Sequence, residues 1–235
     1  GHLKYSMDVL KLSSANRDPR TLHNQVNFAD ACDFNNVYAY VVPRLEQTSS
    51  TVIRSNYLTP SQKSAIITSL KSTKTLGAET LIADPVYMAV NIGLHSSNDE
   101  VLGTDLSELT RIRITRDADS TRSMQSIQTA ANNIIIDYFK QFKLTQTIDI
   151  SSIVNQILNL NGVATLITRR TDRNLFVDGL NLLVWNPIYP EEDVTSTGSN
   201  VPMPYYKYPY LHDPMNFIDK IEVVTETGAT GSVRV

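Results

Sequence analysis

Residues 123–160, SMQSIQTAANNIIIDYFKQFKLTQTIDISSIVNQILNL, decide the fold of this chain. In the first part of this stretch, apolar residues recur at the 3.6-residue spacing of a single helix face. The sequence therefore predicts a long amphipathic helix over residues 123–143. Its apolar stripe consists of Ile127, Ala130, Ala131, Ile134, Ile135, Tyr138, Phe139 and Phe142.

A second helix is predicted directly after the first, over residues 149–160. Asp149 or Ser151 can serve as its N-cap, because short polar side chains accept hydrogen bonds from the first helical N–H groups. Asn161-Gly162 is a typical helix stop. The β-branched residues 163–168 then predict a strand.

The residues before this stretch alternate between strand and helix patterns. Two strand–helix alternations that end in a strand predict a two-layer α/β or α+β sandwich, a mixed sheet with helices on one face. We also expect a β-rich, loop-rich tail after it. The upstream elements are a strand at 36–42, a helix at 60–73, a half-buried strand at 86–94 and a strand at 109–116.

The texture of the sequence divides the chain into three parts. Residues 1–35 show no sustained period and are interpreted as a lead-in segment. Residues 36–170 form the predicted α/β core. Residues 171–235 form the predicted β-rich tail, with strands expected over 180–185 and 217–224, so we expect a boundary near residue 170.

Composition excludes several classes of protein. Lys and Arg number 21 against 24 Asp and Glu, so the net charge of −3 gives no overall attraction to nucleic acid or to an anionic membrane. Charged residues make up 19%, below the usual quarter, and Ser, Thr and Asn fill the difference. Cys32 is a single cysteine, and no apolar run is long enough to span a bilayer.

Catalytic motifs are sparse. No glycine-rich phosphate loop occurs, and the four histidines lie too far apart for a helical metal site. Asp119 in the stretch after residue 116 is better explained as a helix N-cap than as part of a metal loop. A small α/β enzyme that uses His95, or the adjacent pair His212 and Asp213, stays open as one alternative.

Basic residues gather on one strand. Arg111 and Arg113 share the face opposite the isoleucines of the strand 109–116, and Arg116 and Arg122 follow. Guanidinium groups in a row can bind phosphate, so a nucleic-acid-binding module on this face is a second alternative. Arg111 and Arg113 are also candidate interface residues.

Four tyrosines lie within six residues, at Tyr205, Tyr206, Tyr208 and Tyr210. Tyrosine is enriched where protein interfaces carry binding energy, so these four are candidate interface residues. The alternative is that the segment folds over its own sheet and covers an edge.

The order of these elements resembles the baseplate J-like family. The run 75–90, TLGAETLIADPVYMAV, resembles a family segment in which a helix is followed by a Leu-Gly turn, a stretch that ends in proline, and an alternating strand. Residues 134–165 resemble the family's final long helix, short second helix and Gly-Val strand. The resemblance covers residues 36–170 as a pattern.

This resemblance implies a structural protein of a contractile bacteriophage tail rather than an enzyme. It implies a homodimer within each baseplate wedge, contacts with other wedge proteins, and a ring around the tail hub that persists while the baseplate changes shape. No cofactor, metal, nucleic acid, membrane or small-molecule substrate is implied. The opening Gly1-His2 is expected to be a cut or cloning remnant of a longer protein.

Overall fold

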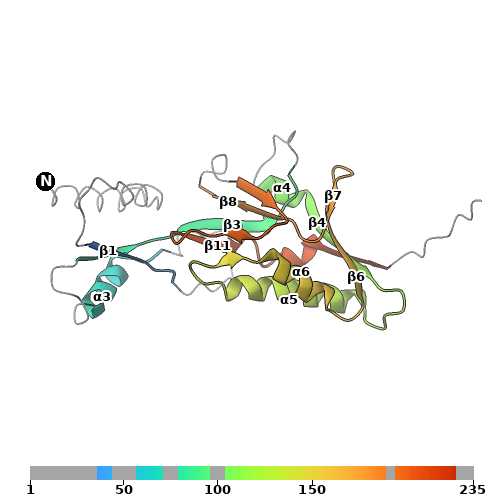
Figure 1. Cartoon of the computed structure of the whole chain (residues 1–235), viewed down its shortest axis with the longest axis horizontal. Helices are drawn as coiled ribbons and strands as arrows, with labels where there is room; N and C mark the ends of the chain where they lie inside the picture. The colour runs from blue at the N-terminus through green and yellow to red at the C-terminus, as the bar shows by residue number, and fades with distance from the viewer. Residues whose placement is uncertain (1–35, 44–56, 71–78, 96–103, 189–193, 226–235) are drawn as a thin grey trace, which may run out of the picture.

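The computed structural model describes residues 36–43, 57–70, 79–95, 104–188 and 194–225, so the predicted lead-in segment lies outside the described residues (Figure 1). The elements in chain order are β1 (Asn36–Tyr40), α3 (Pro60–Leu70), β2 (Glu79–Ala83), β3 (Val86–Ile92), α4 (Thr104–Glu108), β4 (Thr110–Arg116), α5 (Met124–Lys140), β5 (Thr147–Ile148), α6 (Ile150–Leu158), β6 (Val163–Arg170), β7 (Phe176–Asp178), β8 (Leu182–Trp185), β9 (Val194–Thr197), β10 (Val201–Pro202), β11 (Lys207–Leu211), the 3-10 helix η3 (Phe217–Lys220) and β12 (Ile221–Thr225).

Helices α5 and α6 form where the sequence predicts them. The Ser123 hydroxyl accepts a hydrogen bond from the N–H of Ser126 at 3.2 Å and begins α5. The Asp149 carboxylate accepts from the N–H of Ser152 at 3.0 Å and begins α6. Both caps satisfy N–H groups that the first helical turn leaves without partners. Both helices end a few residues earlier than predicted.

Two four-stranded mixed sheets with the same plan form one layer of the fold. Their strand orders are β11-β3-β8-β9 and β12-β4-β6-β7. In each sheet the outer strand, β11 or β12, is parallel to its neighbour, and the other two pairings are antiparallel. The sequence predicted one mixed sheet. The chain instead leaves β3, forms α4 and then starts a second sheet with β4.

Helices α5 and α6 form the second layer and cover one face of the sheets (Figure 1). Helix α5 packs against β11 of the first sheet and β12 of the second, and α6 packs against β6. The predicted two-layer α+β sandwich with helices on one face is confirmed. The residues of α5 that are buried in the common core are Ile127, Ala131, Ile135 and Phe139.

Strand β3 was predicted to be half-buried, but all of its residues are buried. Tyr87 shows why, since its ring lies between those of Tyr57 and Tyr208, at centroid distances of 5.1 and 6.0 Å. Residues far from β3 in the sequence therefore cover the face that the alternation assigned to solvent.

A cluster of buried polar groups joins the two sheets. The hydroxyl of Thr168, on β6, donates to the carbonyl of Gly179 at 2.9 Å and accepts from the N–H of Asn181 at 2.8 Å. The side-chain amide of Asn181 donates in turn to the carbonyl of Gly93, just beyond β3, at 2.6 Å. The second sheet is thus hydrogen-bonded to the end of the first through two side chains.

The expected boundary near residue 170 does not separate two folded units. Strands from the predicted tail complete both sheets, because β11 pairs with β3 and β12 pairs with β4. Hairpin partners β6 and β7 also pair across this boundary. Residues 171–188 and 194–225 are therefore an integral part of the same fold.

The last predicted strand, 217–224, begins later than expected. Residues 217–220 form η3, and β12 starts at Ile221. Lys220 is buried at 4% exposure, and its ammonium donates to the carbonyl of Ser107 at 3.0 Å and to the carboxylate of Glu108 at 2.7 Å. The 3-10 turn places this buried cation beside α4, which the alternating pattern alone could not indicate.

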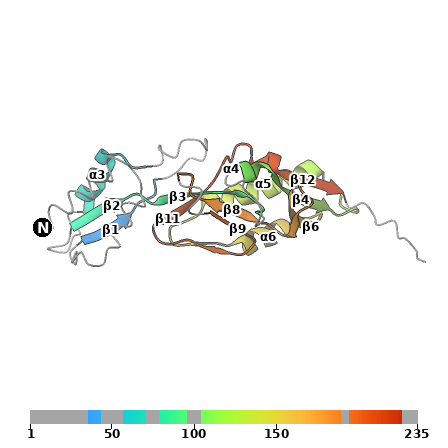
Figure 2. The same cartoon turned by 90° about the horizontal axis from the view of Figure 1, so that it is seen from above.

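Strands β1 and β2, with helix α3, form an arm at one end of the molecule (Figure 2). The two strands pair in parallel, and among the described residues neither has another strand partner. Helix α3 packs against β2 but contains no buried residue. The common core begins at Val86, so the strands and helix of the arm contribute nothing to it.

We predict that Thr168→Val lowers the free energy of unfolding by about 1–3 kcal/mol, because it leaves the buried N–H of Asn181 and the carbonyl of Gly179 without a partner. Thr165→Val, on the same strand but exposed, is the matched control and should change the free energy by less than about 0.5 kcal/mol. Urea denaturation of both variants measures the difference. Equal values for the two would contradict the role assigned to Thr168.

Candidate interaction surfaces

The four candidate tyrosines divide into two pairs. Tyr208 and Tyr210 lie on β11 and are buried at 8% and 5% exposure. The Tyr208 hydroxyl donates to the carbonyl of Phe142 at 3.0 Å, and both rings lie edge-on to Tyr87. Burial raises the pKa of both hydroxyls above the ordinary value. The structure thus places Tyr208 and Tyr210 in the core of their own sheet.

Tyr205 and Tyr206 lie at the base of the arm. Tyr205 is 49% exposed, and its ring lies edge-on to Tyr40 of β1 at 5.6 Å and to Tyr206 at 5.5 Å. Val37, also on β1, is 54% exposed. A partly exposed aromatic surface therefore extends from residues 205–206 onto Tyr40 of the arm, while Val37, three residues from Tyr40, lies on the other face of β1.

Arg111 is used within the chain. Its guanidinium donates to the carbonyl of Glu108 at 2.7 Å and to that of Thr110 at 2.8 Å. The next carbonyl, of Leu109, accepts from the N–H of Thr171 at 2.7 Å. These bonds satisfy the carbonyl groups at the end of α4, which have no partner within the helix.

Arg113 shares a carboxylate with Arg169. Glu222 of β12 lies 3.3 Å from the guanidinium of Arg113 and 3.0 Å from that of Arg169. The guanidinium of Arg116 donates to the carbonyl of Arg122 at 3.0 Å. The predicted row of arginines is thus a set of partly exposed groups that already have protein partners, which weakens the nucleic-acid alternative.

The two candidate histidines lie apart from each other and from the pocket described below. His95 is exposed, and its backbone N–H donates to the Ser196 hydroxyl at 3.1 Å. His212 is partly buried with its ring edge-on to Trp185 at 5.3 Å. The Asp213 carboxylate accepts from the side-chain amide of Asn216 at 2.9 and 3.1 Å. The alternative that uses His212 and Asp213 as an acid–base pair therefore lacks a hydrogen bond between the two side chains.

Burial is the main cause that lowers the pKa of His212 below its ordinary value of 6.5. The Lys220 ammonium lowers this pKa further, while the carboxylates of Asp213 and Glu108 raise it. The neutral form of His212 is therefore favoured in the folded chain.

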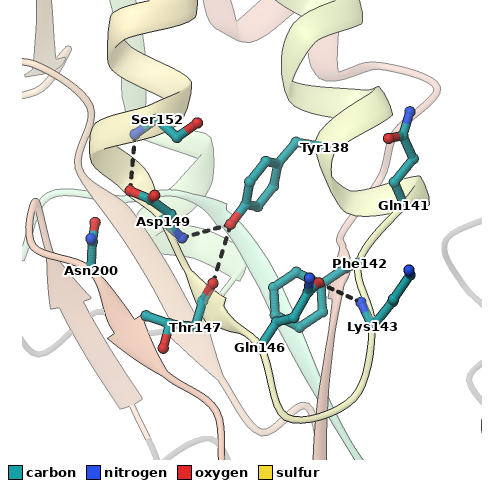
Figure 3. A pocket seen from close by; sticks show the side chains of 9 residues that line it. All are labelled: Tyr138, Gln141, Phe142, Lys143, Gln146, Thr147, Asp149, Ser152 and Asn200. Atoms are coloured by element: carbon teal, nitrogen blue, oxygen red, sulfur yellow. Dashed lines mark hydrogen bonds between the residues drawn. The ribbon is translucent and has the colours of Figure 1, made fainter.

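A polar pocket of about 960 Å³ lies where α5 ends and α6 begins (Figure 3). It contains neither candidate histidine. Sequence reasoning assigned Tyr138 to a helix stripe and Asp149 to a cap, and nothing in the local pattern of Asn200 indicated that it joins them. Its lining residues are Tyr138, Gln141, Phe142, Lys143, Gln146, Thr147, Asp149, Ser152 and Asn200.

Neither a metal-holding cluster nor a membrane-spanning helix occurs in the part of the chain that the structure describes. Within the described ranges, no group of three or more His, Cys, Asp or Glu side chains is placed to hold a metal ion. No helix there is both long enough and apolar enough to cross a membrane.

Comparison of the sequence with protein-family models and with curated protein sequences finds no match. The function proposed below therefore depends on the pattern of the sequence and on the structure.

We predict that acidification from about pH 7.5 to about pH 5 lowers the free energy of unfolding in part through His212. Its pKa is lower in the folded chain than in the unfolded chain, so the stabilisation is present above pH 6.5 and is lost as the pH falls through the folded value. Urea denaturation of His212→Gln should show a weaker loss over this interval than the parent protein. Exposed His95→Gln is the control and should keep the parent's pH dependence; if the two variants behave alike, the burial of His212 does not contribute.

Proposed function

We propose that this chain is a structural subunit of the tail baseplate wedge of a contractile-tailed bacteriophage, most like the wedge protein called gene product six in T-even-type phages. In this proposal it forms a homodimer, contacts other wedge proteins and helps to close a ring around the tail hub. The ring holds together while the baseplate changes shape during infection. The protein is assembled in the cytoplasm of the host bacterium and resides in the virion.

The arm is the observation that carries this proposal. A two-stranded sheet is marginally stable by itself, and parallel strands normally have both faces covered. In the arm, however, β1 and β2 have no other strand partner among the described residues, and α3 has no buried residue. Such an arm is expected in a subunit whose sheet or helix packs against a neighbouring molecule in an assembly.

The exposed side chains at the arm favour a protein partner. Tyr205 is about half exposed, and Tyr40 and Tyr206 join the same surface through ring contacts. Tyrosine contributes large contact area at low cost in side-chain entropy. In a two-fold dimer each such residue is used twice, once from each copy, because the same patch faces itself.

The order of elements is also consistent with the proposal. Long helix α5 is followed by short helix α6, then by a turn at Gly162 with φ of +86° and by strand β6. This is the succession on which the resemblance to the baseplate J-like family was based. A left-handed turn at that point favours glycine.

We predict that the protein is a dimer at micromolar concentration, as measured by light scattering after size-exclusion chromatography. The variant Tyr205→Lys places a charge on this aromatic surface and should raise the dimer dissociation constant by at least about tenfold. Met215→Lys, at a side chain that is 66% exposed elsewhere on the molecule, is the matched control and should leave the dimer unchanged.

A strictly monomeric parent protein would contradict self-association. A dimer that both variants weaken equally, or that neither weakens, would remove the arm as its interface. Electron microscopy of the full-length protein produced together with the proteins encoded beside it tests the wider proposal, which requires wedges or rings that contain this chain.

A further inference from the structure

The pocket between α5 and α6 has the features of a ligand site, and this inference does not depend on the baseplate proposal. Its volume of about 960 Å³ lies in the range of small-molecule sites. One wall comes from the end of α5 and the turn after it, and the other from the start of α6 and Asn200 (Figure 3). Tyr138 supplies apolar ring surface, whereas the ring of Phe142 is buried at 6% exposure.

Tyr138 is fixed in place by the backbone of the opposite wall. Its hydroxyl accepts from the N–H of Asp149 at 2.6 Å and donates to the carbonyl of Thr147 at 3.3 Å. Figure 3 shows the ring held between the two walls by these bonds. The Tyr138 hydroxyl already donates one hydrogen bond and accepts another. A ligand would therefore contact the face of the ring rather than the hydroxyl.

Three backbone N–H groups at the pocket already donate hydrogen bonds to side chains of the protein. The N–H groups of Ser151 and Ser152 donate to the side chains of Asn200 and Asp149, at 3.2 and 3.0 Å. The N–H of Lys143 donates to the side-chain oxygen of Gln146 at 2.8 Å. The start of α6 is therefore already capped, which argues against an anion there.

Side chains instead supply the free hydrogen-bonding groups. The Asn200 oxygen accepts from Ser151 and the Gln146 oxygen accepts from Lys143, so the NH₂ groups of both amides have no protein partner in the described structure. One carboxylate oxygen of Asp149 is also free, since the other accepts from Ser152. With Lys143 and Asp149 on its walls, the pocket has one formal charge of each sign.

We propose that this pocket binds a neutral oligosaccharide, whose sugar hydroxyls accept from the amides of Asn200 and Gln146 and donate to the carboxylate of Asp149. A hydroxyl both donates and accepts, which matches a set of amide donors beside a carboxylate acceptor. The C–H face of a sugar ring packs against the ring of Tyr138. The volume suits about two or three linked sugar units.

The test is a titration of the full chain, labelled with ¹⁵N, with maltotriose and with chitotriose, followed through the side-chain amide signals of Asn200 and Gln146. We expect saturable shifts of these signals with a dissociation constant in the millimolar range. Three comparison compounds, sodium sulfate, triglycine and glycerol, should produce no saturable shift.

Three variants remove one ligand group each while keeping its internal bond. Asn200→Asp and Gln146→Glu retain the accepting oxygen but lose the NH₂ donor, and Asp149→Asn retains the cap but loses the charged acceptor. Each should weaken sugar binding by about fivefold, the value of one hydrogen bond. Gln125→Glu, an exposed residue of the first turn of α5, makes the same chemical change outside the pocket and should leave binding unchanged.

The proposal is overturned if neither sugar shifts these signals at concentrations up to about 0.1 M, which corresponds to negligible affinity. It is also overturned if sulfate or triglycine binds in their place, if glycerol gives the same shifts, or if Gln125→Glu weakens binding as much as Asn200→Asp does.

Discussion

The buried stripe of helix α5 holds the two sheets in one layer. Ile127, Ala131, Ile135 and Phe139 are fully buried, and the helix crosses from β11 of the first sheet to β12 of the second. Each large apolar side chain contributes about 1.5–3 kcal/mol when it is removed from water, so this stripe is a major part of the core. The end of the same helix brings Tyr138 and Phe142 to the pocket, so core packing and the proposed ligand site depend on one element.

Buried polar groups complement this apolar stripe within the core, because Thr168 pairs with Ile112 across the strands and shares its buried face. Where β3 ends and β8 begins, Thr168 and Asn181 exchange hydrogen bonds with the backbone of both sheets. Buried amide and hydroxyl groups are costly unless every partner is present, so such a cluster tolerates few alternative arrangements of the two sheets. Polar groups at the surface also have partners within the chain. Arg111 donates to a backbone carbonyl, and Arg113 and Arg169 form ion pairs with Glu222.

Local patterns predicted the helices well and the sheets less well. The cap at Asp149 lies where predicted and the buried residues of α5 belong to the predicted stripe, but α6 ends at Leu158 with Asn159 as its C-cap, before the predicted stop at Asn161-Gly162. Strand pairing involves distant residues, so the sequence could not show that β11, which contains Pro209, would lie beside β3. The burial of Tyr208 and Tyr210 follows from that pairing, and it places two of the four candidate interface tyrosines in the core.

The proposed ligand site was beyond prediction for the same reason. The local sequence predicted Asp149 as a helix cap. Asn200, however, lies far away in the sequence and comes close to Asp149 only because β10 pairs with β5. Likewise, nothing near Arg111 indicated that its guanidinium would bind the end of α4, because a five-residue helix gives little periodic signal.

The order in which the chain visits the two sheets constrains how the protein can form. The first sheet contains β3 and β11, and the second contains β4 and β12, so each joins an early strand to one of the last. Neither sheet can be completed on the ribosome while the final strands are still unsynthesised, and pairings between distant segments form slowly. Completion of the second sheet therefore has to await synthesis of β12, and a chain that stops short of β12 leaves this sheet with an open edge beside Ile112 and Ile114.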